Sequence, residues 1–350
     1  MPLHTMWRFL KYTFRPTISF TEKNPSIMFS KRLLALICFM TIISVAKNYC
    51  QTPSLSQLFY PNITLRAEYT PETVSDDGTK FGFNRTSAVG IIPLKTEFSA
   101  GFGFGKKLDI QARHNLLIAN VSQIDPTFNG IEKPEGGYKT FGATFIQLKA
   151  SLREKFWLYG VGGGVTQSNE TFFNPQPYFY GGAARLRILG IRTQILYGTA
   201  VIYNQKFRII PVFGFTKGLG KDWKISGILP FRASVSYKVS PWLHLDFNSV
   251  YDGYSAGFQE YTNLEKMIRR QNYQQVRFSL SANANFLNVF NVGLEGGLGA
   301  FRQVKTFNSA NETLSKLSLP AAPYVGVSLR YITTKSKISS KFLKGTGIEI

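Results

Sequence analysis

The chain has 350 residues, with 41 Lys and Arg against 20 Asp and Glu and a formal net charge of +21. Charged residues make up only 17% of it, below the roughly 25% of soluble domains, yet the mean hydropathy of -0.07 excludes a bundle of membrane-spanning helices. Aromatic and small residues are abundant, with 30 Phe, 17 Tyr and 31 Gly, which is typical of strands and turns.

The first fifty residues contain an export signal. The apolar run Leu33–Ala46 follows Lys31-Arg32 and is too short for a membrane helix, so it predicts a signal peptide over residues 28–50, cleaved near Cys50/Gln51. We interpret residues 1–27 as a mis-annotated upstream extension, with a long basic signal as the alternative. The only cysteines lie in this region, so the mature chain has neither a disulfide nor a cysteine metal site.

Residues 51–333 consist of candidate strands joined by alternately short and long connections. Bacterial barrels have even strand counts, tight periplasmic turns and long extracellular loops, so the pattern predicts an all-β fold, an antiparallel transmembrane β-barrel of 12–14 strands. One long connection carries the predicted surface helix Glu260–Gln271. The candidate strands are 62–70, 94–104, 108–121, 138–151, 155–167, 176–189, 191–203, 207–216, 223–239 (one long or two short), 242–255, 274–287, 290–304 and 322–333. The long connections are 71–93, 122–137, 168–175, 256–273 and 305–321.

Four late strands show which face is apolar. Phe231–Val239, Trp242–Tyr251, Val276–Phe286 and Pro323–Tyr331 alternate large apolar residues with Ser, Asn, Gly and Arg. A water-exposed sheet would carry dense Lys and Glu instead, so we expect lipid on the apolar face. Aromatic residues at strand ends are typical of membrane interfaces, and we assign this role to Trp157, Trp223, Trp242 and Tyr251. A soluble periplasmic or adhesive β-sandwich remains the alternative fold.

Three segments resemble a known group of proteins: Pro177–Gly182, Leu229–Tyr237 and Pro323–Tyr331. They are similar to the outer-membrane β-barrel proteins of uncharacterised function found in Bacteroidota, over roughly residues 28–333. The resemblance implies a barrel and no catalytic residues. The chain departs from many barrels in following its last strand with a basic, polar tail, residues 334–350, instead of ending in an aromatic residue.

The polar phase of the strands is expected to line the lumen, and it is mainly basic. Rings of Arg and Lys favour anions, whereas mutual salt bridges with the fewer acids would fill the interior instead. Of the histidines, His244 shares its phase with Asp246, so an outer-membrane lipid hydrolase is a further alternative. The lumen candidates are Arg113, Arg185, Arg187, Arg192, Arg232, Lys238, His244, Asp246, Arg277 and Arg330.

The leading interpretation is a non-enzymatic barrel in the outer membrane of a Gram-negative bacterium. It would be either a narrow, anion-leaning pore or a structural surface protein, with no catalytic residue, metal or cofactor. The expected partners are outer-membrane lipid and lipopolysaccharide, the barrel-assembly machinery and a small anionic solute. Nucleic acid is not expected, because the basic residues are scattered along strands and turns.

Overall fold

A computed structural model describes residues 61–333 except 76, 104–106, 130–136, 152–154, 169–174, 191–192, 205, 263–264 and 287–288. The predicted upstream extension, the signal peptide over residues 28–50 and the basic tail lie outside the described residues. Every regular element in the described part is a strand. No helix there has the length and apolarity to span a membrane.

The structure contains fifteen strands, most of them long, and they alternate in direction along the chain from β1 to β14. They are β1 Asn62–Val74, β2 Lys80–Gly103, β3 Lys107–Asn129, β4 Tyr138–Ser151, β5 Lys155–Ser168, β6 Gln176–Gly190, β7 Thr193–Asn204, β8 Lys206–Leu219, β9 Trp223–Leu229, β10 Arg232–Lys238, β11 Leu243–Thr262, β12 Glu265–Phe286, β13 Phe290–Phe307, β14 Thr313–Leu319 and β15 Ala322–Ile332.

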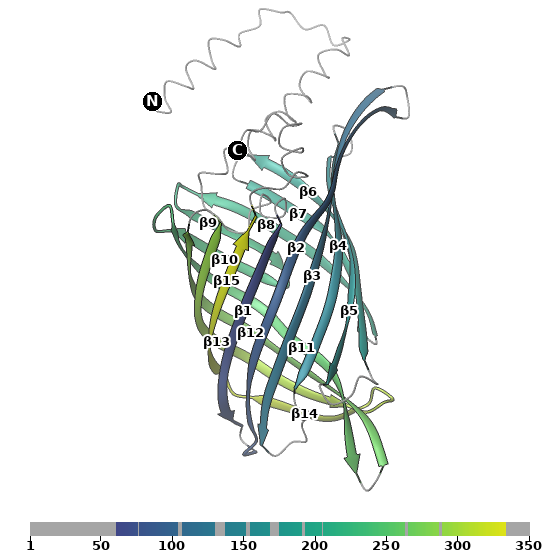
Figure 1. Cartoon of the computed structure of the whole chain (residues 1–350), viewed down its shortest axis with the longest axis vertical. Coiled ribbons are helices and arrows are strands. Elements are labelled where there is room, and N and C mark those ends of the chain that lie inside the picture. The colour runs from purple at the N-terminus through teal and green to yellow at the C-terminus, as the bar shows by residue number, and fades with distance from the viewer. Residues whose placement is uncertain are drawn as a thin grey trace, which may run out of the picture. The chain divides into compact units, whose positions relative to one another are not determined.

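The strands form one closed antiparallel ring (Figure 1). Each of β1 to β13 pairs with its sequence neighbour, and β15 pairs with both β13 and β1, which closes the sheet. Strand β14 pairs only with β13 and continues β15 beyond Pro320, so the ring has fourteen strands. The predicted antiparallel barrel of 12–14 strands is confirmed, and the β-sandwich alternative is wrong. Closure leaves no edge along the ring's paired length.

We call the end where β1 begins and β15 ends the proximal end, and the other the distal end. The distal connections are shorter than the sequence suggested, because the strands continue into them. The predicted loop 71–93 is mostly β1 and β2, joined by a turn in which Asp77 accepts a hydrogen bond from the Thr79 N–H at 3.0 Å. The predicted helix Glu260–Gln271 is wrong: this segment forms the ends of β11 and β12, paired up to Thr262 and Glu265. At the proximal end the β2–β3 hairpin projects past its neighbours (Figure 1).

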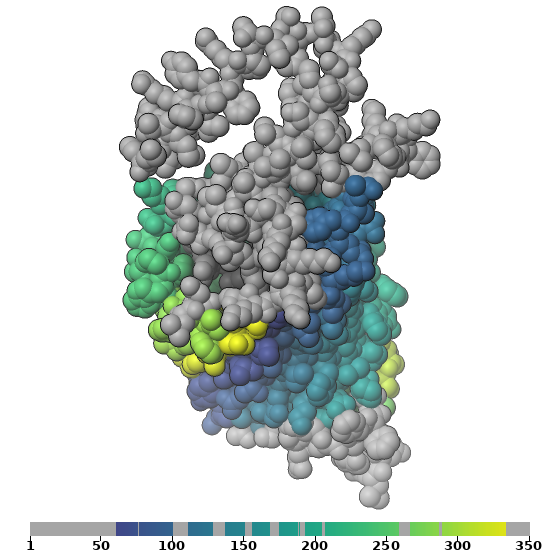
Figure 2. Space-filling view, turned by 45° about the horizontal axis from the view of Figure 1, so that its top comes forward, coloured from purple at the N-terminus to yellow at the C-terminus, as the bar shows by residue number. Residues whose placement is uncertain are grey.

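The outer face of the barrel is apolar. On β1, Ile63, Leu65 and Tyr69 point outward and are about half exposed, while Asn62 and Glu68 point inward and are buried. The same alternation runs through Val325, Val327 and Leu329 on the paired strand β15. Figure 2 shows β1 to β5 side by side in this outer wall. Exposed apolar side chains on nearly every strand are unfavourable in water and favourable in hydrocarbon, which is why this is a transmembrane barrel.

Aromatic side chains gather near both ends of the outer face. At the proximal end, Trp223 packs on Tyr237 with ring centroids 4.6 Å apart, and Trp157 stacks on Tyr159. Trp242 is half exposed at the same end. At the distal end, Phe179, Tyr203 and Phe207 form a chain of ring contacts. Such bands suit the two interfaces of a membrane, where a ring is half wet.

Candidate functional site

The lumen is lined by the inward phase of each strand, and several of the predicted residues lie there. Residues directly opposite in an antiparallel pair share a face. His244 lies opposite Lys238 and Asn283, and Asp246 lies opposite Ser236 and Ser281. The inward residues from the sequence prediction are Arg232, Lys238, His244, Asp246, Arg277 and Arg330.

Three of the predicted lumen residues are on the outer face instead. Arg113 is exposed and lies on the phase opposite to the buried His114 and Leu116. Arg185 and Arg187 alternate with the inward Ala184 and Leu186, and Arg185 lies over the ring of Trp157 at 5.9 Å. All three are near the proximal end, where a long cationic side chain on the outer face can reach the water phase. Arg192 lies outside the described residues.

The residues of the hydrolase alternative do not form an acid–base pair. His244 is 2% exposed, and neither of its ring nitrogens has a hydrogen-bond partner among the described residues. The Asp246 carboxylate accepts a hydrogen bond from Asn283 Nδ2 at 2.7 Å. Because His244 is bonded neither to the acid nor to a serine hydroxyl among the described residues, the arrangement lacks the oriented base that acyl transfer needs. No cluster of His, Cys, Asp or Glu within the described ranges could hold a metal ion.

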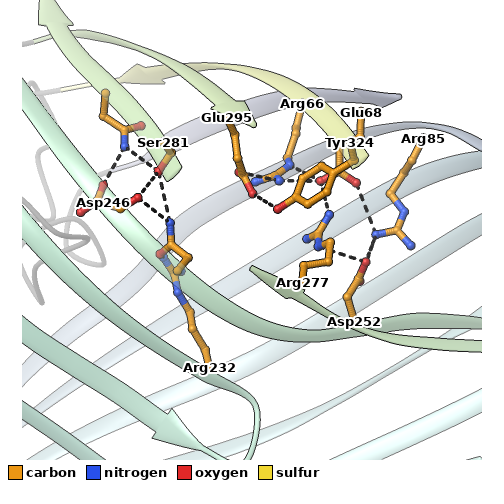
Figure 3. A network of polar contacts seen from close by, with 12 residues as sticks. Arg66, Glu68, Arg85, Arg232, Asp246, Asp252, Arg277, Ser281, Glu295 and Tyr324 are labelled. Atoms are coloured by element: carbon orange, nitrogen blue, oxygen red, sulfur yellow. Dashed lines mark hydrogen bonds and ion pairs between the residues drawn. The ribbon is translucent and has the colours of Figure 1, made fainter. Parts of the chain in front are cut away.

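An ion-pair network crosses the middle of the lumen (Figure 3). Its members are Arg66, Glu68, Arg85, Asp252, Arg277, Glu295 and Tyr324, from β1, β2, β11, β12, β13 and β15. Arg85 Nη1 donates to both oxygens of Asp252, at 3.0 and 2.9 Å, which joins β2 to β11. Arg277 Nη1 donates to Glu68 Oε1 at 2.6 Å. The network therefore ties together strands that are not neighbours in the ring.

Glu68 is the centre of this network, and sequence reasoning missed it. Its side chain is 3% exposed and lies within ion-pair distance of Arg66, Arg85 and Arg277. Arg66 also reaches Glu295 Oε2 at 2.8 Å. The inward phase of β1 could have revealed Arg66 and Glu68, since Thr64, Arg66 and Glu68 alternate with Leu65, Ala67 and Tyr69. Arg85 lay in a segment predicted as loop.

An aromatic layer fills part of the distal lumen. Its members are Phe81, Phe83, Ile124, Phe128, Tyr138, Tyr254, Ala256, Phe258, Tyr273, Val304 and Leu319, all buried. They come from β2, β3 and β4 on one side and from β11 to β14 on the other. The hydroxyls of Tyr138 and Tyr254 both donate to Gln271 Oε1, at 3.2 and 2.9 Å. Strand β11 also contacts β5, so its distal part leans across the barrel interior.

A bulge in β13 turns one more cation into this layer. Val276 of β12 pairs with Ala300 of β13, whereas Gln274 pairs with Gln303, so the register shifts by one residue between these two pairs. Phe301, in the bulge, has a φ of 52°. One extra residue reverses the phase of a strand, so Arg302 points inward and is 2% exposed. Its Nε donates to the Tyr273 hydroxyl at 2.9 Å, and its Nη1 donates to Thr73 Oγ1 at 2.7 Å.

A cavity of about 680 Å³ lies beside the layer, within the range of small-molecule sites. Inward residues of β2 to β8 line it, among them Ser122, Thr140 and Tyr178. The other boundary is the distal part of β11 and β12. There the outward phase of the hairpin, including Ser255 and Asn272, faces the cavity because the hairpin leans inward.

The wall beside this cavity is interrupted. Strands β9 and β10 have only 7 residues each. Strand β8 therefore pairs with β9 only from Phe213 onward, and β11 pairs with β10 only up to Val250. We call the gap between residues 206–212 of β8 and residues 251–262 of β11 the wall opening. Phe231, in the β9–β10 turn at its base, lines the cavity, so cavity and opening are continuous.

Comparisons with known proteins add little to this picture. No family model and no curated protein matches the chain. An outer membrane channel from Pseudomonas putida F1 has 11% identity and a TM-score of 0.33, covering 82% of this chain and 98% of that chain. The transport unit of the autotransporter AIDA-I from Escherichia coli has 7% identity and a TM-score of 0.28, covering 87% and 99%. The outer membrane channel DcaP of Acinetobacter baumannii has 9% identity and a TM-score of 0.23, covering 78% of this chain and 96% of that chain. No function is transferred at such values.

Proposed function

We propose that the chain is a non-enzymatic outer-membrane barrel that takes a small solute into its internal cavity and is closed to ions along its axis. The observation that carries this proposal is the 680 Å³ cavity, which lies next to two closed regions of the lumen, the ion-pair network and the aromatic layer. An open anion-leaning pore is less well supported. Three lumen arginines, Arg66, Arg85 and Arg277, already have carboxylate partners.

The test is conductance of the purified barrel in a planar lipid bilayer. We expect the wild-type barrel to carry no steady current, because packed aromatic rings and paired charges leave no water-filled path. A steady wild-type conductance, of either selectivity, would overturn the proposal.

A variant that is expected to conduct serves as the positive control for insertion of the barrel into the bilayer. The variant replaces Tyr254–Tyr273 by Asn-Gly, a two-residue turn that joins the paired residues Gly253 and Gln274. It also carries Arg85→Ala and Asp252→Ala, which remove both partners of the cross-lumen ion pair and so leave neither charge unpaired by the loss of the other. This variant removes four members of the aromatic layer, and we expect discrete conductance steps from it.

A further inference from the structure

Two arginines at the wall opening have no carboxylate partner within the part of the chain that the structure describes. Arg208 on β8 and Arg270 on β12 both line the cavity, so two like charges face the same space. Neither makes an ion pair among the described residues. Nε and Nη1 of Arg270 are buried without a hydrogen-bond partner there, and its guanidinium lies over the ring of Phe307 at 4.4 Å. Arg270 is partly buried, so its charge is costly unless an anion joins it, while Arg208 is exposed and lines the same cavity.

The remaining charges of the cavity do not supply that anion. Among the described residues that line it, Asp252 is the only acid, and Arg85 and Arg277 already hold its carboxylate. The cavity therefore has a cationic site with free donors. Arginine presents a planar set of N–H donors that matches a carboxylate or a phosphate.

Apolar side chains surround the cationic site. Ile202, Ile210, Phe231 and Tyr251 line the cavity near the wall opening. On the outer surface of β8, Phe207 and Ile209 are 77% and 73% exposed. A molecule in the hydrocarbon could therefore reach the cavity along these apolar side chains, and would meet the two guanidinium groups inside.

From this geometry we infer that the cavity binds an anionic amphiphile, a molecule with a carboxylate or phosphate head and an apolar tail, which arrives through the wall opening. The head is held between Arg208 and Arg270, and the tail lies along the isoleucine and aromatic side chains. This inference rests on the proposed function and names its solute class.

The test is binding to the purified barrel in lipid nanodiscs by calorimetry, with dodecanoate as the probe. We expect saturable binding that weakens about tenfold for Arg208→Gln and for Arg270→Gln, the loss expected for one hydrogen bond between charged groups. Arg187→Gln is the matched control, since it removes the same charge from the outer face and should leave binding unchanged. Heat-dependent gel migration checks that each variant is folded.

Two further probes separate head from tail. Dodecanol has the same tail without the charge, and acetate has the same head without the tail. We expect both to bind at least tenfold more weakly than dodecanoate. Equal binding of dodecanol, or no effect of the two arginine variants, would overturn recognition of the head. Equal binding of acetate would overturn recognition of the tail.

The route is tested by lengthening the β9–β10 hairpin by two residues on each strand between Ile228 and Arg232, which extends pairing into the wall opening. We expect slower association of dodecanoate from the membrane with affinity retained, and an unchanged rate would overturn the route. If dodecanoate does not bind while the wild-type barrel carries no current in the bilayer, only the binding of an anionic amphiphile is refuted. A conducting wild-type barrel would refute the proposed function whatever it binds.

Discussion

At the residue scale, ion pairs between arginines and carboxylates neutralise much of the positive charge in the lumen. Glu68 receives three arginines and is nearly inaccessible to solvent. Removing one member of a buried ion pair leaves the other charge uncompensated, which costs more than the pair contributes. The stability of the ring should therefore depend strongly on this one carboxylate.

Glu68→Gln should lower the free energy of unfolding in detergent by about 3 kcal/mol, because it keeps the side-chain shape and leaves three arginines short of a partner. Urea titration followed by gel migration measures the change. Glu72→Gln is the control, since Glu72 lies on the same strand and is exposed. Similar losses at both positions would mean that Glu68 is not the centre of the network.

Glycines on β5 let tyrosines lie flat against the inner wall. A Cβ added at Gly164 would overlap the Phe141 carbonyl oxygen and lie 2.5 Å from the Tyr178 hydroxyl, whereas one at Gly90 on β2 would meet nothing within 4 Å. Overpacking typically costs about 1–3 kcal/mol. Gly164→Val should thus destabilise the barrel by that amount in the same titration, and Gly90→Val by about 0.5 kcal/mol or less. A larger loss at Gly90 would contradict the packing of Tyr178.

At the element scale, alternation predicted most strands but not where phase changes. Strand β4 matches its predicted range, 138–151, because its outward Phe141 and Phe145 alternate without interruption. The phase reversal that turns Arg302 inward depends on a bulge at Phe301, which no periodicity announces. On β6, the charge of Arg185 suggested a position in the lumen. Near a membrane interface, however, a long cationic side chain on the outer face can reach water, so charge alone does not assign the face.

The hairpin of β11 and β12 shows a second limit. Its charged tip, Glu260–Gln271, has the spacing of a surface helix, yet the two strands pair with each other as far as Thr262 and Glu265. Pairing between the two consecutive strands outweighs the local helical preference. The wall opening was also beyond the sequence. Two short strands over 223–239 were one of the two alternatives, but a short hairpin makes a gap only because β8 and β11 are longer.

Leu280→Arg on β12 tests which face of the wall meets hydrocarbon. Leu280 is on the outer face and 58% exposed, and arginine at the middle of a bilayer costs roughly 2–4 kcal/mol in a barrel. Ser122→Arg is the comparison, because Ser122 lines the cavity and its replacement can reach water. Reversible folding into lipid vesicles gives both values. A greater loss at Ser122 would reverse the assignment of faces.

At the scale of the whole molecule, the sequence predicted a closed ring but not what fills it. Counting basic residues on polar phases suggested an anion-leaning pore, with mutual salt bridging as the alternative. The alternative describes the ion-pair network better, since its three arginines face Glu68, Asp252 and Glu295. Which charges meet depends on strands far apart in the sequence, such as β2 and β11, and single-strand patterns do not contain that information.

The most direct measurement is a nitroxide scan along β4, comparing collision rates with oxygen and with a water-soluble nickel chelate. Residues 61–333 contain no cysteine, so single labels can be placed in a barrel from which Cys38 and Cys50 have been removed. We expect high oxygen and low nickel contact at Phe141, Ala143 and Phe145, and low oxygen contact at Thr140, Gly142 and Thr144. High nickel contact at the first three positions would show that water, not lipid, surrounds the ring.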